Sequence, residues 1–325
     1  MDSLRNSLQR LDPRSGHGAD EPVSREREGN RFAQLRGSDF VESIPFWLPA
    51  TLLVLLFVYG AIGWNVAISF TGWSGLGQPD YTNFTLEMYR QMPADQNFRA
   101  SLRNTVALLV AFTSVSLVVG LGLALLVDRK IRFENTFRTI YLLPMALSFV
   151  VTAIFWSWMY ASDGLINTTL AAVGLEALAF DWLGDPRFKL AAVIFALVWQ
   201  FSGYCMIVYL AGLRSIPDDH YEAARIDGAS TLTLYRRVII PQLRSSTIGA
   251  TVVLMVFALK AFDFIYVMFG DNPGRSADIL AVTMYRQAFS ASEWAYGAAI
   301  AVVLFALALT IIGPYAYTQY KRGAL

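Results

Sequence analysis

The sequence is poor in the side chains that most enzymes use for chemistry. It contains one cysteine, Cys205, so no disulfide forms within the chain and no redox chemistry is indicated. His17 and His220 are the only histidines, which leaves no histidine-based metal cluster or triad. No nucleophile–base pair or metal constellation is evident, so a membrane enzyme is the least favoured class of function.

An ATP-binding loop is also missing. None of the lysines follows a glycine in the G-x-x-x-x-G-K-[ST] pattern that cradles phosphates. We therefore expect no cofactor on this chain. Any energy-requiring step that it takes part in must be driven by another chain or by an ion gradient. The four lysines are Lys130, Lys189, Lys260 and Lys321.

Charged residues are scarce, at 16% of the chain, against about 25% in a soluble domain. Hydrophobic residues make up 55% and gather into runs of about 20 residues, the length that crosses a bilayer. A soluble helical bundle is therefore disfavoured. The runs predict an all-α polytopic membrane protein with six transmembrane helices, at residues 46–70, 105–127, 139–160, 190–213, 247–269 and 296–317.

Positive charge is unevenly distributed along the chain, although the net charge of +1 gives no indication of a nucleic-acid partner. Arginine and lysine concentrate in residues 1–44, in the second and fourth connections and at the C-terminus. The positive-inside rule then places both termini and the fourth connection, residues 214–245, in the cytoplasm. Residues 1–44 are polar and rich in arginine, which predicts a flexible tail before a membrane domain at 45–325.

The fourth connection has the pattern of two short helices. Pro217 suits a first helical position, and the acidic residues that follow it suit the positive end of a helix dipole. Gly228 is placed to end this helix in a left-handed conformation. Ser230 is placed to cap a second helix, which Pro241 is expected to stop.

Polar residues inside two predicted spans are candidates for a translocation pathway. Lys260 and Asp263 are three residues apart, so one helical face holds both and lets them pair. They either line the pathway or form a neutralised pair that fixes helix packing. Gln200, Phe201 and Tyr204 combine polar and aromatic groups, which suits a sugar but also suits ordinary helix–helix contacts.

The fourth connection resembles the signature loop of inner-membrane permease subunits of binding-protein-dependent ABC importers. More than a dozen positions agree at fixed spacing, and the likeness extends over roughly residues 45–325. The matching segments are Leu213-Arg214-Ser215-Ile216-Pro217, Tyr221-Glu222-Ala223-Ala224, Ile226-Asp227-Gly228-Ala229 and Ile240-Pro241.

Flanking segments are similar to the first permease of carbohydrate importers of the maltose and glycerol-phosphate types. Residues 270–274 depart from the Gly-Gly-Pro that members commonly have, and Lys260 lies where asparagine is common. The nature of the solute therefore stays open. The flanking matches are Asn104-Thr105, Phe137-Arg138, Leu143-Pro144, Gly164-Leu165-Ile166-Asn167, Tyr285, Ala288-Phe289 and Tyr296-Gly297-Ala298-Ala299.

The resemblance implies a type I importer permease fold with a cytoplasmic coupling helix. It also implies a second permease, two ATPase subunits that use ATP and Mg²⁺, an extracytoplasmic solute-binding protein, and location in the cell membrane. The helix around Glu222 would enter a groove of the ATPase and meet a basic residue there. The implied coupling residues are Tyr221, Glu222, Ala223, Ala224, Asp227, Gly228 and Ala229.

Two alternatives to a carbohydrate permease of an ABC importer are open. A permease of the same architecture would import a polyol, a glycerol phosphate or a charged sugar, with Lys260 as an anion contact. An ion-coupled secondary carrier would have inverted repeats and no docking loop, whereas this chain has a docking loop and no convincing repeat.

Overall fold

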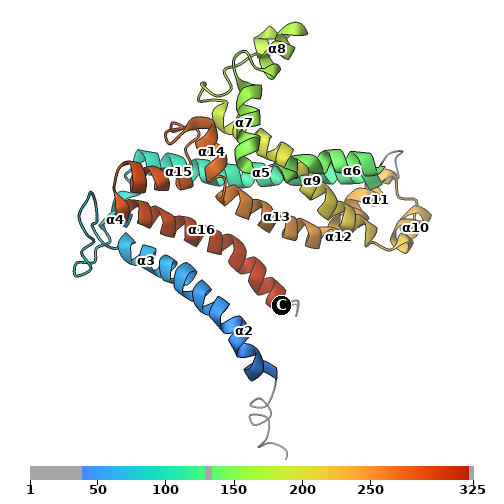
Figure 1. Cartoon of the computed structure of the whole chain (residues 1–325). Coiled ribbons are helices and arrows are strands. Elements are labelled where there is room, and N and C mark those ends of the chain that lie inside the picture. The colour runs from blue at the N-terminus through green and yellow to red at the C-terminus, as the bar shows by residue number, and fades with distance from the viewer. Residues whose placement is uncertain (1–38, 129–133, 322–325) are drawn as a thin grey trace, which may run out of the picture. The chain divides into compact units, whose positions relative to one another are not determined.

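The computed structural model describes residues 39–128 and 134–321, and every regular element within these residues is a helix (Figure 1). Most of the predicted tail, residues 1–38, lies outside this described part. The elements are α2 (Asp39–Val54), η1 (Leu55–Tyr59), α3 (Gly60–Ser69), α4 (Glu87–Gln91), α5 (Gln96–Asp128), α6 (Glu134–Leu142), η2 (Leu143–Ala146), α7 (Phe149–Tyr160), α8 (Leu165–Ala172), η3 (Glu176–Leu178), α9 (Lys189–Arg214), α10 (Asp218–Ile226), α11 (Thr231–Leu234), η4 (Tyr235–Ile239), α12 (Ile240–Gln242), α13 (Arg244–Leu259), α14 (Phe262–Phe269), α15 (Leu280–Tyr285), η5 (Arg286–Ser290) and α16 (Trp294–Lys321).

The chain divides between Gly60 and Ala61 into two compact units. In the first unit the described elements are α2 and η1, whose apolar side chains are largely exposed. The second unit, Ala61–Leu325, contains the helix bundle and both candidate sites described below.

Five helices of the described chain are long and apolar enough to cross a membrane, and a sixth is counted if one bent pair forms a single span. The first, second, fourth and last agree with the predicted spans, with ends that differ by up to nine residues. The five are Ser43–Ser69, Gln96–Asp128, Phe149–Ala172, Lys189–Arg214 and Trp294–Tyr317, and the bent pair is Thr231–Gln242 with Arg244–Leu259.

The third predicted span, 139–160, is not one helix. It consists of α6, the short 3₁₀ turn η2 and α7, with an extended residue, Leu147, between η2 and α7. Pro144 lies in η2 and has no N–H to continue an α-helical ladder, which explains the break. The apolar run 139–160 is therefore interrupted near Pro144 and does not form the one continuous helix expected.

The fifth predicted span, 247–269, is also broken. Helix α13 ends at Leu259, and α14 begins at Phe262 after Lys260 and Ala261 leave the helical conformation. In lipid, the backbone groups freed at a break need partners or an aqueous lining. At this break the N–H groups are paired, since Lys260 donates to the carbonyls of Val256 and Phe257 at 3.2 and 3.1 Å, and Ala261 donates at 3.2 Å to that of Ala258.

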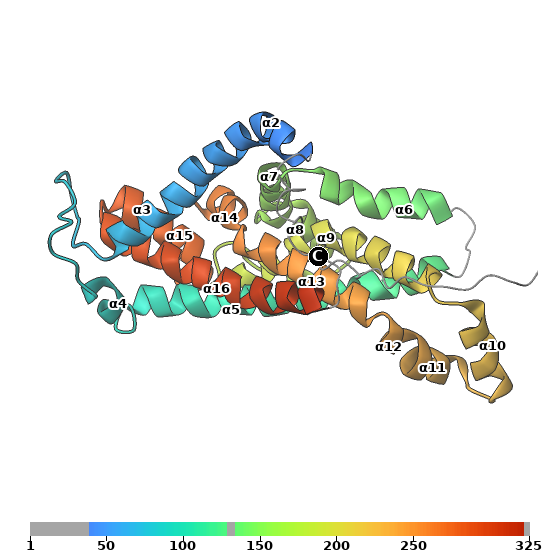
Figure 2. The ribbon, with the colours of Figure 1, turned by 90° about the horizontal axis from the view of Figure 1, so that it is seen from below.

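The core of the second unit is the contact between α5 and α9, which lie along each other in both views (Figures 1 and 2). Buried residues recur every three or four positions along α5, so one face of that helix enters the core. At Gly120 the two helices approach so closely that an added Cβ would lie 2.2 Å from Cβ of Cys205. Cys205 is fully buried, as expected for a small packing residue.

Replacing Gly120 with alanine is expected to destabilise the fold. The new methyl group would also come within 3.0 Å of backbone atoms of α9, and overpacking of this kind typically costs about 1–3 kcal/mol. Gly122→Ala is the matched control, because open space surrounds Gly122 in the same helix. Thermal unfolding in detergent should show a lower Tm for Gly120→Ala only, and equal Tm values for both variants would contradict the close approach.

Candidate functional site

The fourth connection forms a helical hairpin that projects beyond α9 at one end of the second unit (Figures 1 and 2). Pro217 is the cap before α10, one residue earlier than predicted, with φ −59° and ψ 142°. Gly228 has φ +76°, the left-handed conformation predicted for it. Ser230 caps α11 by accepting a hydrogen bond from the N–H of Thr233 at 3.4 Å, as predicted.

Helix α10 has one buried residue, Ala224. Ala224 is 6% exposed and Tyr221 is half-buried, so these two face the bundle. Glu222, Ala223 and Asp227 are exposed, and Glu222 also lies at the edge of the groove described below. The two helices also expose apolar side chains, Ile226 at 86% and Leu232 at 76%. A helix with an exposed mixture of acidic, small and apolar residues is suited to contact another protein.

The second helix of the hairpin ends at Gln242, one residue after the predicted stop at Pro241. The chain widens into a π-turn, in which the N–H of Ile240 donates to the carbonyl of Tyr235, and continues through Pro241 to Gln242. The wider turn just before Pro241 accommodates a residue that has no N–H. The following helix, α13, begins at Arg244 and is bent by 63° relative to residues 231–242.

A groove of about 1310 Å³ lies between the hairpin and the ends of α5, α6 and α9. Glu134, at the start of α6, accepts hydrogen bonds from Arg138 at 2.7 Å and from Arg214 at 2.5 Å. Arg214 is the last residue of α9, so this double ion pair fixes the base of the hairpin against α6. Tyr221 and Glu222 of α10 line the same groove.

Gln200 and Phe201, two of the predicted pathway residues, are buried within the chain. Gln200 is 2% exposed and donates from Nε2 to the carbonyl oxygen of Leu147 at 2.9 Å, which provides a partner for the backbone at the break before α7. Phe201 is 3% exposed, and its ring lies 4.7 Å from that of Phe257. In this structure both side chains stabilise helix packing.

The other three pathway candidates are more accessible. Tyr204 is half-buried, whereas Lys260 and Asp263 are exposed on either side of the break in the fifth span. Of the two alternatives for Lys260 and Asp263, the neutralised pair is not seen, because none of the four ion pairs between described residues joins them. The prediction assumed a continuous helix, and the interruption at Lys260–Ala261 removes the three-residue periodicity that would align the side chains.

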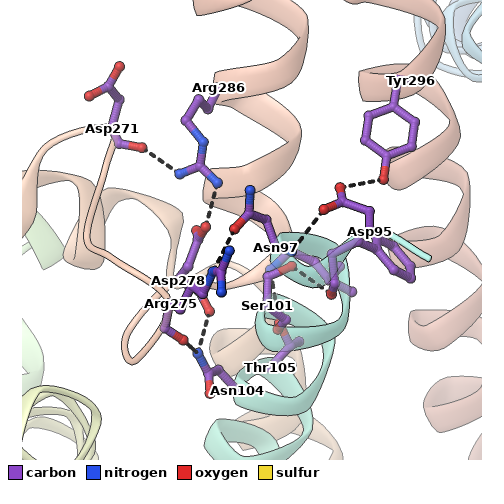
Figure 3. A network of polar contacts seen from close by, with 12 residues as sticks. Asp95, Asn97, Ser101, Asn104, Thr105, Asp271, Arg275, Asp278, Arg286 and Tyr296 are labelled. Carbon is purple, nitrogen blue, oxygen red and sulfur yellow. Dashed lines mark hydrogen bonds and ion pairs between the residues drawn. The ribbon is translucent and has the colours of Figure 1, made fainter. Parts of the chain in front are cut away.

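At the end of the second unit opposite α10, a polar network holds the connection between the last two spans (Figure 3). Arg286 donates to the carboxylate of Asp278 and, at 2.8 Å, to the carbonyl of Asp271. Asn104 of α5 donates to the carbonyl of Asp278 at 2.9 Å, and Thr105 accepts from the N–H of Leu280 at 2.9 Å. The connection is therefore attached to α5 through backbone and side-chain contacts.

The carboxylate of the ion pair in this network is buried, and its partner Arg286 is partly buried. Asp278 is 4% exposed, and its burial raises the pKa of the carboxyl group while the guanidinium of Arg286 opposes that rise. Around the pair, Arg275 donates to Asn97 at 3.1 Å (Figure 3). A buried pair of this kind holds its elements in one arrangement, because separating the charges leaves one of them unpaired.

Residues 116–323 match the family of inner-membrane components of binding-protein-dependent transport systems. The match covers more than half of the chain, so the chain belongs to this family. It is a multi-pass permease subunit of an ABC importer and contributes to the translocation pathway. It is a transport subunit and not an enzyme, because ATP hydrolysis in such importers resides in a separate subunit.

Particular relatives agree with this assignment. The xylose/arabinose import permease of Haloferax volcanii is 54% identical over 89% of this chain and 91% of its own length. The trehalose/maltose transport permease of Thermococcus litoralis is 29% identical over 81% and 88% of the two chains. A chain of a bacterial alginate ABC transporter has the same fold, with a TM-score of 0.74 at 20% identity, over 90% of this chain and 98% of that chain. The predicted type I importer permease fold is confirmed.

The sequence did not predict the polar network at the connection between the last two spans. The sequence marks Asn104 and Thr105 only as a pair that matches the permease family, because their hydrogen-bond partners are more than 170 residues away. Asp278 and Arg286 lie eight residues apart and in different elements, so no helical periodicity relates them. The available signal was an aspartate next to a run of apolar residues, Ile279 to Val282, which also enters the core.

Arg286→Leu is expected to destabilise the protein by about 3–5 kcal/mol, because it leaves the buried Asp278 carboxylate without its partner. The double variant Asp278→Asn with Arg286→Leu should recover part of this loss. The control is Arg187→Leu, which breaks an exposed ion pair with Asp185 and should leave the Tm nearly unchanged. Thermal unfolding in detergent is the measurement, and similar Tm values for both single variants would refute a structural role of the buried pair.

Proposed function

We propose that this permease imports a carbohydrate and that pentoses are the first substrate class to test. Support comes from the two relatives described above, which are xylose/arabinose and trehalose/maltose permeases. The first has the higher identity to this chain, 54%, and its named solutes are five-carbon sugars. The chain itself would form half of the pathway.

The importer would contain a second, similar permease, two ATP-binding subunits that use ATP and Mg²⁺, and an extracytoplasmic solute-binding protein. The family consists of components of transport systems that depend on such a binding protein. The absence of a phosphate-cradling loop from the sequence agrees with ATP being bound by other chains. This chain would then bind no cofactor, and its contacts would be with those subunits and with membrane lipid.

The observation that carries the mechanism is the free surface of α10. The helix is attached at its base by the Glu134 ion pairs and at Ala224, while Glu222, Ala223 and Asp227 are exposed. We infer that this surface enters a groove of the ATPase, with Glu222 meeting a basic residue and the small Ala223 permitting close approach. Gly228 and Ala229 shape the turn that follows, with Ala229 donating to the carbonyl of Ala224 at 3.0 Å.

ATP-driven closure of the ATPase pair would move α10 and swing the pathway from inward-open to outward-open, as a rigid-body change. This mechanism requires the hairpin and both termini to be cytoplasmic, as the distribution of arginine and lysine predicts. The polar network of Asp278 and Arg286 would then lie at the outer face of the cell membrane.

Lys260 and Asp263 are the favoured pathway residues, with Tyr204 as a further contact. Both charged side chains are exposed at a break in a membrane span, where charges are costly unless they face water, a solute or a partner. Gln200 and Phe201 would act behind this surface by holding α7 and α9 together.

Glu222→Ala is expected to reduce solute uptake at least tenfold without preventing membrane insertion, because loss of the exposed carboxylate would weaken the grip of the ATPase. Gly228→Val should have a similar effect, since a β-branched residue is disfavoured at φ +76°. Uptake and ATP hydrolysis should be measured together on the complex in proteoliposomes. ATP hydrolysis should become uncoupled from transport.

Two controls separate coupling from local strain. Gly228→Asn should retain most activity, because asparagine tolerates the left-handed conformation. Glu176→Ala, an exposed acid in η3 far along the chain from the hairpin, should transport normally. Normal uptake by both Glu222→Ala and Gly228→Val would remove α10 from the mechanism.

The solute class is tested by uptake of D-xylose, L-arabinose, maltose, glycerol and glycerol phosphate into proteoliposomes. We expect pentose uptake that depends on ATP inside the vesicle and on the binding protein outside it. Preferential uptake of glycerol phosphate, lost in Lys260→Met, would favour the anionic-solute alternative. Uptake without ATP, driven by an ion gradient, would indicate a secondary carrier.

A further inference from the structure

Six aromatic side chains form a continuous series from the outer connection to the break in the fifth span. They come from three separate parts of the chain, namely the segment after α3, helix α14, and the α15–α16 region. Neighbouring ring centroids are 5.2 to 5.6 Å apart throughout. In order, the rings are Trp73, Trp294, Phe289, Tyr285, Tyr266 and Phe262.

These rings differ from the aromatic residues of the core. Phe112 and Phe264 are completely buried, whereas every ring of the series is accessible, and Phe289 is 60% exposed. The two tryptophans are positioned by hydrogen bonds, since Trp294 donates to the carbonyl of Gly75 at 3.0 Å and Trp73 donates to that of Gly77 at 2.6 Å. Accessible rings with fixed positions are suited to bind a ligand.

The inner end of the series does not face lipid. On α14, Phe262, Asp263 and Tyr266 lie on one side, and the opposite side contains the fully buried Phe264 and Ile265. Asp263 is exposed on the same side as the two rings, and Lys260 is exposed just before them. Because charged side chains at membrane depth turn away from hydrocarbon, this face meets a polar, water-accessible space.

The series also has a rigid support. Arg286 lies in the helix between Tyr285 and Phe289 and is held by Asp278 and by the carbonyl of Asp271 (Figure 3). Asn104 of α5 holds the same connection. The polar network therefore fixes the helix that carries Tyr285 and Phe289.

We propose that this series is a track along which a sugar moves from the outer face to Lys260 and Asp263. The proposal rests on the proposed function and specifies how a neutral sugar ring is recognised. The apolar face of a sugar stacks on an aromatic ring, and its hydroxyl groups remain free for water or for polar side chains. Several weak, closely spaced contacts allow a solute to enter and also to leave, as transport requires.

The test uses the complete importer in proteoliposomes, with D-xylose, L-arabinose and maltose as probes. Phe289→Leu and Tyr285→Leu should each lower the uptake rate of the imported sugar, at concentrations that do not saturate transport, by about 2- to 10-fold, the range expected for one lost aromatic contact. Phe289→Trp should retain uptake, because it restores a ring. Phe305→Leu is the matched control, since Phe305 is 45% exposed on α16 and belongs to no ring pair in the described residues.

ATP hydrolysis stimulated by the sugar-loaded binding protein is the second readout. It should stay at the wild-type level in Phe289→Leu and Tyr285→Leu, because the track contacts the sugar and not the partner protein. A parallel loss of stimulation and uptake would show that the rings bind the binding protein, and this overturns the track. Normal uptake by both leucine variants also overturns it, while wild-type sugar import remains intact. If the wild-type complex imports none of the three sugars, the proposed function fails and the track fails with it.

Discussion

The close approach of α5 and α9 at Gly120 and Cys205 is the contact on which both functional ends depend. Helix α9 leads directly into the hairpin at Arg214, and α5 carries Asn104, which holds the connection at the opposite end. A wider separation would loosen both attachments at once. Small residues at such a crossing let two membrane helices make close van der Waals contact where no hydrophobic driving force exists.

The hairpin and the connection between the last two spans are attached to the bundle by different interactions. The hairpin is joined to the bundle by few contacts and leaves its acidic and apolar side chains exposed, which suits a surface that another protein must grip. The connection between the last two spans is joined by a buried ion pair and by hydrogen bonds to its backbone, which suits a fixed support. The break at Lys260 interrupts the fifth span, and the N–H groups of Lys260 and Ala261 pair with carbonyls of the preceding turn.

Much of this molecule was predictable from the sequence, because its strongest signals are local. Four of the apolar runs, the left-handed Gly228 and the cap at Ser230 depend on composition or on neighbours a few residues away. The break before α7 has a local signal in Pro144, but the partner of the Leu147 carbonyl, Gln200, comes from another helix. The break at Lys260 was not predictable, because neither proline nor glycine marks it. The burial of Asp278 and the missing Lys260–Asp263 pair likewise depend on the tertiary arrangement.

The bend between residues 231–242 and helix α13 has a mechanical consequence. At 63°, a displacement along the first helix is delivered to the second mainly as a sideways force. Helix α13 ends at Leu259, so its far end, one residue before Lys260, would swing through an arc while its near end turns about Leu243. The bend would thus convert a displacement along the axis of residues 231–242 into a rotation of α13. Two helices on one straight axis would instead move together along that axis.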